Sequence, residues 1–414
     1  MSAIQSVVEW LEDGARSSQL SEDVLTELCR RMVEAGIPLW RAAVFVTTLH
    51  PDFMGRAFYW RDDTGIKVVE AGYDMMEREE YLQSPVVAVY GTRQPLRRHL
   101  ADPACPDDYP VFKEFRADGA TDYVAFPLAF TDGSIHVATW MTRQAGGFTP
   151  QQYADLTAVI APLTRVAEIR ALRRTAANLL NTYVGRQAGE QILAGRIRRG
   201  HVEAIQAVLW LSDMRGFTAR SERLPPGELI DLLNRYFDCQ VPVILAYGGE
   251  VLKFIGDGLL AIFPLGGDRS DAREACRRAL ICARTAQAQI AALEAPAGEH
   301  DAVRFGLALH IGEVMYGNIG GGNRLDFTCI GPAVNLAARL EKRAASLGRA
   351  VVASAEFAGF APGEFIPLGE FTVAGISAPQ TVFGLADPTR PAEGDDAVSR
   401  SRSPEGRPGT ARTS

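Results

Sequence analysis

The stretch from Ala207 to Pro264 constrains the fold of this chain most strongly. It contains two apolar runs typical of strands, and an amphipathic helical segment lies between them. Each run ends at a single aspartate, Asp213 and Asp257, with glycines close by that let backbone approach a bulky anion. Hard divalent cations take one or two protein carboxylates and leave their other positions to water and phosphate oxygens. The two aspartates therefore predict a metal site.

A lone aspartate at a strand end is more often a turn former, and Asp257-Gly258 between apolar runs is an ordinary hairpin signal. A second block, residues 324–341, favours chemistry over that interpretation. It runs from a short strand into a helix on which Asn335 and Arg339 stand four apart and share one face. An amide and a guanidinium on one face can bind phosphate, or charge that develops on it.

With these blocks in place, about residues 203–385 resemble the class III nucleotidyl cyclases. Four motifs occur in the order of that family: SDMRGFT, EVLKFIGDGLLAIF, GLALHIGEVMYGNIG and DFTCIGPAVNLAARLE. The resemblance implies a domain that pairs head to tail with a second copy of itself. Such a pair converts a nucleoside triphosphate to a 3′,5′-cyclic nucleotide and pyrophosphate at the interface between the two copies.

The resemblance also assigns roles to single residues. Asp213 and Asp257 match the metal-binding carboxylates, which hold two Mg²⁺ or Mn²⁺ ions per site. Asn335 and Arg339 match the pair that positions the ribose and stabilises the transition state. Further substrate-binding positions follow the first aspartate, at Gly216, Phe217 and Thr218.

Lys253 matches the purine-selecting lysine contributed by the other subunit, and Thr328 falls where adenylate cyclases carry Asp or Thr. Guanylate cyclases typically have Glu and Cys at these two positions. Lysine only donates hydrogen bonds and threonine both donates and accepts, so the pair fits the ring nitrogen and exocyclic amine of adenine. Cys329 directly follows Thr328, and Gly331 and Asn335 fix the register that separates the two. ATP is therefore the expected substrate.

One position departs from the family pattern. Gly306 occupies a place where some relatives carry a basic residue for the phosphates. Arg304 lies nearby in the sequence, but we expect its side chain on the opposite face of the strand.

The catalytic block, residues 203–386, is expected to form an α+β sheet with a ferredoxin-like centre and helices on one face. Pro242 should kink or shorten its first helix, expected at about residues 225–247. The predicted sheet elements are a strand at residues 204–211, a hairpin at 250–263, a strand at 303–311, and a strand and hairpin at 314–330, with a second helix at 271–293.

Residues 1–150 have a different pattern, in which helical segments flank antiparallel strands and Asp132-Gly133 supplies a hairpin turn. This order suggests an α+β sensory domain of the GAF or PAS kind, whose signal is an unknown small molecule or protein. Seven aromatic residues line either a ligand pocket or, as burial statistics favour, the core: Trp40, Phe58, Tyr59, Trp60, Tyr123, Phe126 and Trp140.

Residues 151–202 are predicted to form a helical linker that dimerises and transmits the sensor state. A helix should run from Thr149 to about Val184, with apolar residues at coiled-coil spacing: Ile169, Leu172, Ala176, Leu179 and Tyr183. A helix packed on its own domain would show a similar stripe. Residues 387–414 are rich in Pro, Ser, Gly and charge, and are predicted to be a disordered tail.

Composition narrows the class further. The formal charge of −7 argues against a nucleic-acid footprint. Six scattered cysteines without Cys-x-x-Cys spacing indicate reduced thiols in a cytoplasmic protein, and no apolar run is long enough for a membrane span.

The leading hypothesis is a homodimeric adenylate cyclase with an N-terminal sensor. A nucleotide-binding regulatory protein without turnover and a guanylate cyclase are the alternatives. A diguanylate cyclase is set aside, because Gly266-Gly267-Asp268 lies after the hairpin and is followed by Arg269.

Overall fold

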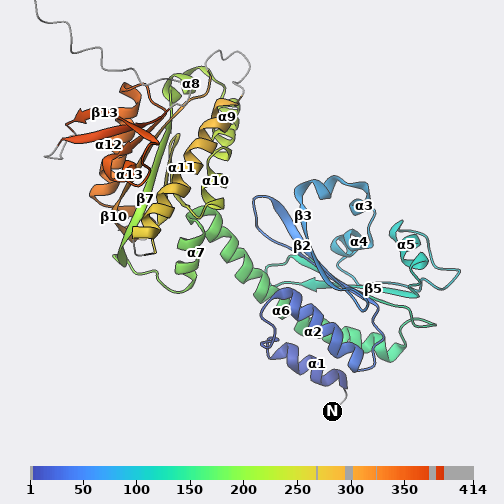
Figure 1. Ribbon diagram of the computed structural model, residues 1–414. Coiled ribbons are helices and arrows are strands. Elements are labelled where there is room, and N and C mark those ends of the chain that lie inside the picture. Colours follow the sequence, from blue (N-terminus) through green and yellow to red (C-terminus); the bar gives the residue numbers. More distant parts are fainter. Residues whose placement is uncertain (1–2, 267–268, 294–301, 323, 373–378, 387–414) are drawn as a thin grey trace, which may run out of the picture. The chain divides into compact units, whose positions relative to one another are not determined.

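The computed structural model describes residues 3–266, 269–293, 302–322, 324–372 and 379–386 (Figure 1). The chain is of mixed α+β type, as predicted, and divides into two compact units, Met1–Arg196 and Ile197–Ser414. Among the described residues, no helix combines the length and apolar character needed to cross a membrane. The predicted tail at residues 387–414 lies outside the described residues.

The N-terminal unit is built on a six-stranded antiparallel sheet in the order β3-β2-β1-β6-β5-β4. Its strands are β1 (Arg41–Thr47), β2 (Phe53–Arg61), β3 (Gly65–Gly72), β4 (Leu96–Arg98), β5 (Asp122–Ala129) and β6 (Ile135–Thr142). Its helices are α1 (Ala3–Glu12), α2 (Ser21–Glu34), the 3-10 turn η1 (Tyr73–Glu77), α3 (Glu79–Leu82), α4 (Pro85–Thr92), α5 (Val111–Ala117), α6 (Pro150–Val184) and α7 (Arg186–Leu193).

Strand alternation gives this sheet two apolar faces. On β5, Val124 and Phe126 pack with α1, α2 and α6, whereas Tyr123 and Ala125 pack with α4 and α5. Of the seven aromatic residues named above, all but Tyr59 are buried, which confirms the prediction that they are mainly core. Tyr59 and Tyr123 also line a cavity on the α4 and α5 side.

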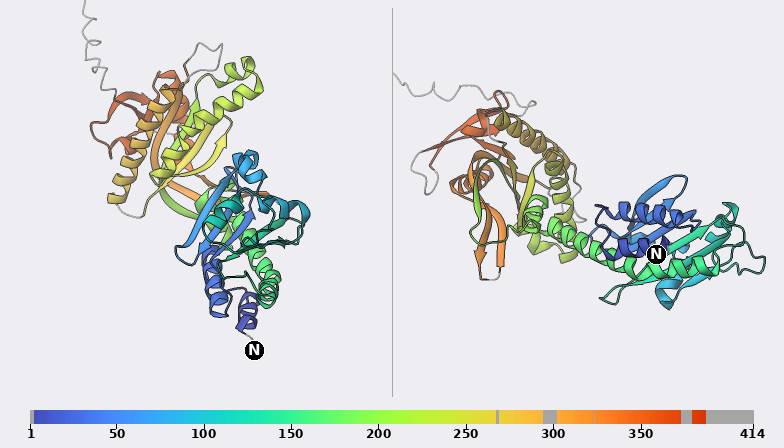
Figure 2. Two further views of the ribbon diagram at one scale, coloured as in Figure 1. Left: turned by 90° about the vertical axis from the view of Figure 1, so that its right-hand side faces the viewer. Right: turned by 90° about the horizontal axis from the view of Figure 1, so that it is seen from below.

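Helix α6 begins where the sequence predicted. The Thr149 hydroxyl accepts a hydrogen bond from the Gln152 amide, the Gln152 side chain accepts one from the Thr149 amide, and Pro150 occupies the first turn. Figure 2 shows α6 as one long green helix. The apolar stripe from Ile169 to Tyr183 is exposed on this chain.

The C-terminal unit has an eight-stranded sheet in the order β13-β14-β12-β10-β7-β9-β8, with β11 paired to β10. The strands are β7 (Val202–Met214), β8 (Glu250–Ile255), β9 (Gly258–Pro264), β10 (Phe305–Gly321), β11 (Arg324–Ile330), β12 (Val351–Ser354), β13 (Phe365–Phe371) and β14 (Gln380–Leu385). The helices are α8 (Phe217–Arg223), α9 (Pro226–Asp238), α10 (Val241–Ala246), α11 (Arg269–Ala291), α12 (Pro332–Ser346) and α13 (Ala355–Ala358).

The centre of this sheet has the predicted ferredoxin-like order, since the chain runs strand, helix, two hairpin strands, helix and strand, with β10 and β7 adjacent. The helix expected at residues 225–247 is shortened at Pro242, as predicted: it is divided into α9 and α10, with Pro242 in the first turn of α10. One detail differs from the sequence prediction. The strand expected at residues 303–311 and the first strand of the hairpin expected at 314–330 form one continuous strand, β10, whose pairing with β7 continues through Gly312, and β11 is the second strand of that hairpin.

The prediction that helices cover one face of this sheet is wrong. Helices α9, α10, α11 and α13 pack on the face that carries Trp210, Phe263 and Leu309. Helix α12 covers the other face, where Leu336 and Leu340 pack against strand residues that include Ala308 and Val352. Because successive strand residues point to opposite faces, the buried pairs Ala308-Leu309 and Val352-Ala353 need apolar cover on both sides.

Candidate active site

Two neighbouring strands bring the predicted metal carboxylates together. Asp213 lies at the end of β7, and Asp257 lies in the two-residue turn between β8 and β9. Pairing of Ser212 with Leu259 sets the two strand ends side by side, and the Met214 amide donates a hydrogen bond to Asp257 Oδ2 at 3.2 Å. Both carboxylates are half-buried.

The electrostatics of this pair indicate a site for cations. Partial burial, together with a hydrogen bond to Asp213 and its negative charge, raises the pKa of Asp257 to about 7. Gly258 permits the close approach, because a Cβ there would lie 3.0 Å from the Ser212 carbonyl oxygen and 3.6 Å from Asp213 Oδ1. No cluster of three ligating side chains exists among the described residues. Two carboxylates suit Mg²⁺ or Mn²⁺, which take their remaining ligands from water and phosphate.

The chain turns directly after the first aspartate. Gly216 adopts a φ of 76°, a left-handed conformation that favours glycine, and α8 begins at the next residue. Phe217 packs against the apolar core, and Thr218 is exposed. The three predicted substrate-binding residues therefore form the turn after β7 and the start of α8, beside the carboxylates, with the Phe217 ring packed against the core.

The structure also brings the two predicted purine-selecting residues into one neighbourhood. Lys253 on β8 donates a hydrogen bond from Nζ to Asp326 Oδ2 on β11 at 3.3 Å. Asp326 and Thr328 are two apart in β11 and so lie on one face of it, whereas Cys329 points to the other face. Thr328 is only 4% exposed, and its hydroxyl has no hydrogen-bond partner. Buried hydroxyls are normally paired, so this one is available to a ligand.

Asn335 and Arg339 lie on α12, whose opposite side carries the apolar stripe that packs on the sheet. Asn335 is exposed and Arg339 is half-buried. Within the described part of the chain, neither side chain makes a hydrogen bond or ion pair, either with the carboxylates or with the purine-selecting pair. Their functional groups are therefore free to meet a ligand.

Sequence reasoning missed two residues of this site. Asp326 could have been found from its spacing to Thr328. The second, Arg215, forms an ion pair with Glu341 of α12, with 2.8 Å between Nη1 and Oε1, and donates from Nη2 to the Glu341 carbonyl at 3.3 Å. Burial raises the pKa of Glu341, and the Arg215 charge offsets part of that rise.

The Arg215 guanidinium also lies directly over Gly306, the position that departs from the family pattern. A Cβ at Gly306 would overlap this guanidinium and lie 2.7 Å from its Nε. Gly306 is paired with Asp213 across β10 and β7. The guanidinium of Arg215, just after β7, therefore occupies the space that a side chain at position 306 would fill.

Comparison with known proteins identifies this domain. Residues 202–378 match the family model described as the adenylate and guanylate cyclase catalytic domain. The chain therefore contains a class III nucleotidyl cyclase catalytic domain, a member of the adenylate and guanylate cyclase family.

Two curated relatives have the same sequence identity to this chain. The chain is 31% identical over 183 residues to adenylate cyclase 1 of Rhizobium meliloti, and the matched residues cover 43% of this chain and 27% of the relative. The chain is also 31% identical over 147 residues to an adenylate cyclase of Anabaena cylindrica, and this match covers 35% of this chain and 28% of the relative. The chain thus spans little more than a quarter of the length of these relatives.

Two solved structures are also similar to it. The adenylyl cyclase CyaB from P. aeruginosa is 28% identical with a TM-score of 0.39, and the match covers 46% of this chain and 98% of that one. A bacterial light-regulated adenylyl cyclase is 32% identical with a TM-score of 0.38, and the match covers 44% of this chain and 91% of that one.

Proposed function

We propose that this protein is an adenylate cyclase, which converts ATP to 3′,5′-cyclic AMP and pyrophosphate at sites shared between two copies of the chain. The observation that carries the proposal is the paired carboxylates of Asp213 and Asp257, where burial and the neighbouring Asp213 together raise the pKa of Asp257. Two divalent cations held there, Mg²⁺ or Mn²⁺, would activate the ribose 3′ oxygen and neutralise the departing pyrophosphate.

The side chains of the domain have distinct roles in this reaction. The 3′ oxygen attacks the α-phosphorus in line with the leaving pyrophosphate, so the ribose and the triphosphate must be held in one orientation. Asn335 orients the ribose, and Arg339 meets the charge on the transferring phosphoryl group. The turn at Gly216 and the start of α8, with Phe217 and Thr218, bind the triphosphate next to the carboxylates.

Selection of adenine is assigned to Lys253 and Thr328. The lysine donates to a ring nitrogen of the purine, and the unpaired Thr328 hydroxyl accepts from the exocyclic amine. Guanine would require an acceptor opposite its donor edge, and neither residue supplies a carboxylate there. Asp326 holds the Lys253 ammonium while no nucleotide is bound.

The geometry of a single chain favours a homodimer with shared sites. Asp213 pairs with Gly306 near the start of β10, whereas Thr328 pairs with Gly317 near its end. Thr328 thus lies toward the other end of β10 from the metal-binding pair of the same chain. Head-to-tail pairing would place the purine-selecting pair of a second copy beside the carboxylates of the first.

We further propose that the N-terminal domain regulates this activity. The assigned parts are a sensory domain of the GAF or PAS kind at residues 1–150, a dimerising and transducing linker at 151–202, the cyclase domain at 203–386 and a tail at 387–414. Support for the linker comes from the exposed apolar stripe on α6, in which Leu172 is 61% exposed. Such a stripe is buried when two helices pair.

The test is incubation of the purified full-length protein with ATP or with GTP, each with Mg²⁺ and separately with Mn²⁺. Mass spectrometry then quantifies the cyclic nucleotides. We expect cyclic AMP to form preferentially from ATP. Cyclic GMP as the main product would overturn the assignment of ATP as substrate and identify a guanylate cyclase. A folded dimer that binds ATP but forms no product would favour a regulatory protein without turnover.

A further inference from the structure

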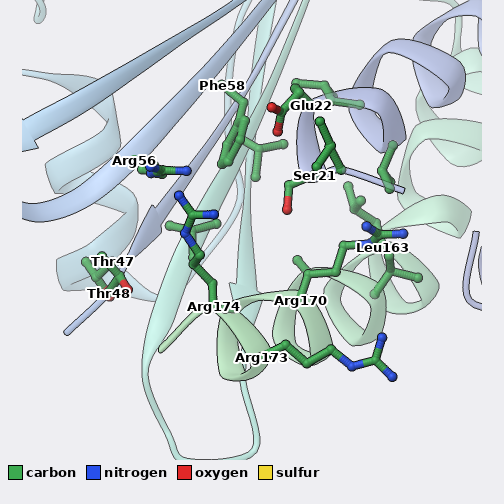
Figure 3. Close-up of a pocket in the computed structure, with 18 of the residues that line it drawn as sticks. Ser21, Glu22, Thr47, Thr48, Arg56, Phe58, Leu163, Arg170, Arg173 and Arg174 are labelled. Carbon is green, nitrogen blue, oxygen red and sulfur yellow. The ribbon is translucent and has the colours of Figure 1, made fainter. Parts of the chain in front are cut away.

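The N-terminal unit contains a cavity of about 390 Å³ between α2, the strands β1 and β2, and α6 (Figure 3). This volume lies in the range of small-molecule sites. Its floor is apolar and comes from all three layers: Val24, Leu25, Val44, Val46, Phe58, Leu163 and Val166.

The rim of this cavity is strongly cationic. Four arginines line it, Arg56, Arg170, Arg173 and Arg174, against one carboxylate, Glu22. Arg170 is already engaged, because its guanidinium donates to the carbonyls of Ser18 at 2.5 Å and Gln19 at 2.7 Å. Its role is to fix α6 to the segment before α2.

Two of the other arginines have unused donors. Arg56 forms an ion pair with Glu70, but its Nε is buried and has no hydrogen-bond partner. Arg174 has no side-chain hydrogen bond or ion pair within the described residues. Figure 3 shows its guanidinium directed from α6 toward the cavity, on the side of Arg56 and Phe58, whereas Arg173 extends away from them.

We propose that this cavity binds an amphipathic carboxylate, a small organic acid with an apolar body. The body packs on the valine, leucine and phenylalanine floor, and the carboxylate accepts hydrogen bonds from Arg56 Nε and from Arg174. A neutral apolar ligand would leave the buried Arg56 donor unpaired, and a wholly polar one would leave the floor uncovered. The site does not depend on the proposed cyclase activity.

A second cavity, of about 470 Å³, lies on the other face of the same sheet. Arg56 borders both cavities, and the other cations of the second cavity are engaged by the protein itself. Arg41 lies between the rings of Tyr59 and Phe115, 5.5 and 5.0 Å from their centroids, and Arg78 pairs with Asp74. Arg41 therefore provides a matched control for substitutions at Arg174.

Occupancy of the first cavity would act on α6. Residues from Leu163 to Ala177 of this helix line the cavity, and the helix continues to Val184. A bound carboxylate adds contacts between α6 and the sheet that the empty cavity lacks. The proposal therefore predicts slower amide hydrogen exchange in this part of α6 when the ligand is bound.

The test is isothermal titration of the full-length protein with sodium decanoate below its micelle concentration, and with decan-1-ol as the neutral analogue. We expect saturable binding of decanoate, and at least tenfold weaker binding of decan-1-ol. Arg174→Gln should raise the Kd of decanoate about tenfold, since one charge-assisted hydrogen bond is lost. Ala171→Leu, a helix-compatible change in the wall, should also weaken it, whereas Arg41→Gln should leave it unchanged.

Several results would overturn the proposal. The first two are a lack of saturable decanoate binding and an equal affinity for decan-1-ol. The third is loss of binding in Arg41→Gln with retention in Arg174→Gln, a result that would place the ligand in the other cavity. Arg174 is exposed, and Ala171 is only partly buried at the edge of the core and faces the cavity, so these variants should melt like the wild type. Hydrogen exchange gives a second readout, and unchanged exchange in α6 on saturation with decanoate would also contradict the proposal.

Discussion

Replacing Gly306 by alanine tests whether the Arg215 guanidinium is a fixed part of the active site. Gly306 lies in a regular strand without a positive φ, so alanine is acceptable to the backbone. The new Cβ would nevertheless overlap the guanidinium, which must leave. Because Arg215 is long and flexible, we expect its side chain to move while the strands stay in place.

The cost of that movement falls on Glu341. Glu341 is 6% exposed and its carboxylate pairs with Arg215, so this carboxylate would be left buried without a cation. Breaking a buried ion pair costs about 3 to 5 kcal/mol, and Arg215 is partly exposed, which favours the low end. Alanine regains about 0.5 kcal/mol or more relative to glycine in a strand. We expect a net loss of about 2 kcal/mol in the free energy of unfolding.

The loss should depend on pH with a definite sign. Burial already raises the pKa of Glu341 in the folded state, and removal of Arg215 raises it further. A group whose folded pKa is raised favours folding at low pH, and this contribution is lost as pH rises through the folded pKa. The deficit of Gly306→Ala should therefore be larger at pH 8 than at pH 5.

Urea unfolding of a fragment spanning residues 197–386 measures this effect without the N-terminal unit. Gly321→Ala is the matched control, because it lies on the same strand and its added Cβ would meet nothing within 4 Å. In a Glu341→Gln background, Gly306→Ala should cost almost nothing, since no buried charge remains to be stranded. An equal cost in both backgrounds, or at both pH values, would refute the reasoning.

Three further results are expected. Asp257→Asn should abolish both turnover and the thermal stabilisation by Mn²⁺, and near-normal activity of this variant would contradict the metal assignment. In the wild type, the stabilisation by Mn²⁺ should be larger at pH 8 than at pH 6, because the pKa of Asp257 is about 7 and the cation requires the ionised carboxylate. An Asp213→Ala subunit mixed with an Arg339→Ala subunit should regain activity, up to half of the wild type per mixed dimer, because one shared site is then intact; no recovery in well-formed mixed dimers would argue against shared sites. Thr328→Val should leave stability unchanged or raise it by about 1 kcal/mol, because the hydroxyl has no partner in the protein, while KM for ATP rises, and a destabilised protein with unchanged KM would assign the hydroxyl to the fold.

Local patterns predicted the centre of the cyclase domain well. The hairpin around Asp257 and the strand that ends at Asp213 depend on alternation and glycine placement, which are properties of short segments. Their adjacency follows from the ferredoxin-like strand order, which the order of elements already favours. The break between α9 and α10 is likewise local, since Pro242 permits a helix to start but not to continue.

Features that depend on tertiary contacts were not predictable in this way. The position of α12 on the second face of the sheet depends on which strand residues remain uncovered after α11 has packed. Arg215 reads in sequence as a loop residue, and only the fold shows that its guanidinium lies over Gly306 and against Glu341. No spacing rule connects these three positions, because they come from three separate segments.

Two of the charge pairs in the cyclase domain, both at the proposed active site, differ in how easily a nucleotide can open them. Lys253 and Asp326 form an exposed pair, and exposed ion pairs contribute only about 0 to 1 kcal/mol. A purine can therefore recruit the Lys253 ammonium at little cost. Arg215 and Glu341 form a buried pair whose rupture strands a carboxylate, so this pair resists exchange. On the proposed assignment of the site, its phosphate end is pre-formed in the free chain, and its purine end is completed by the nucleotide.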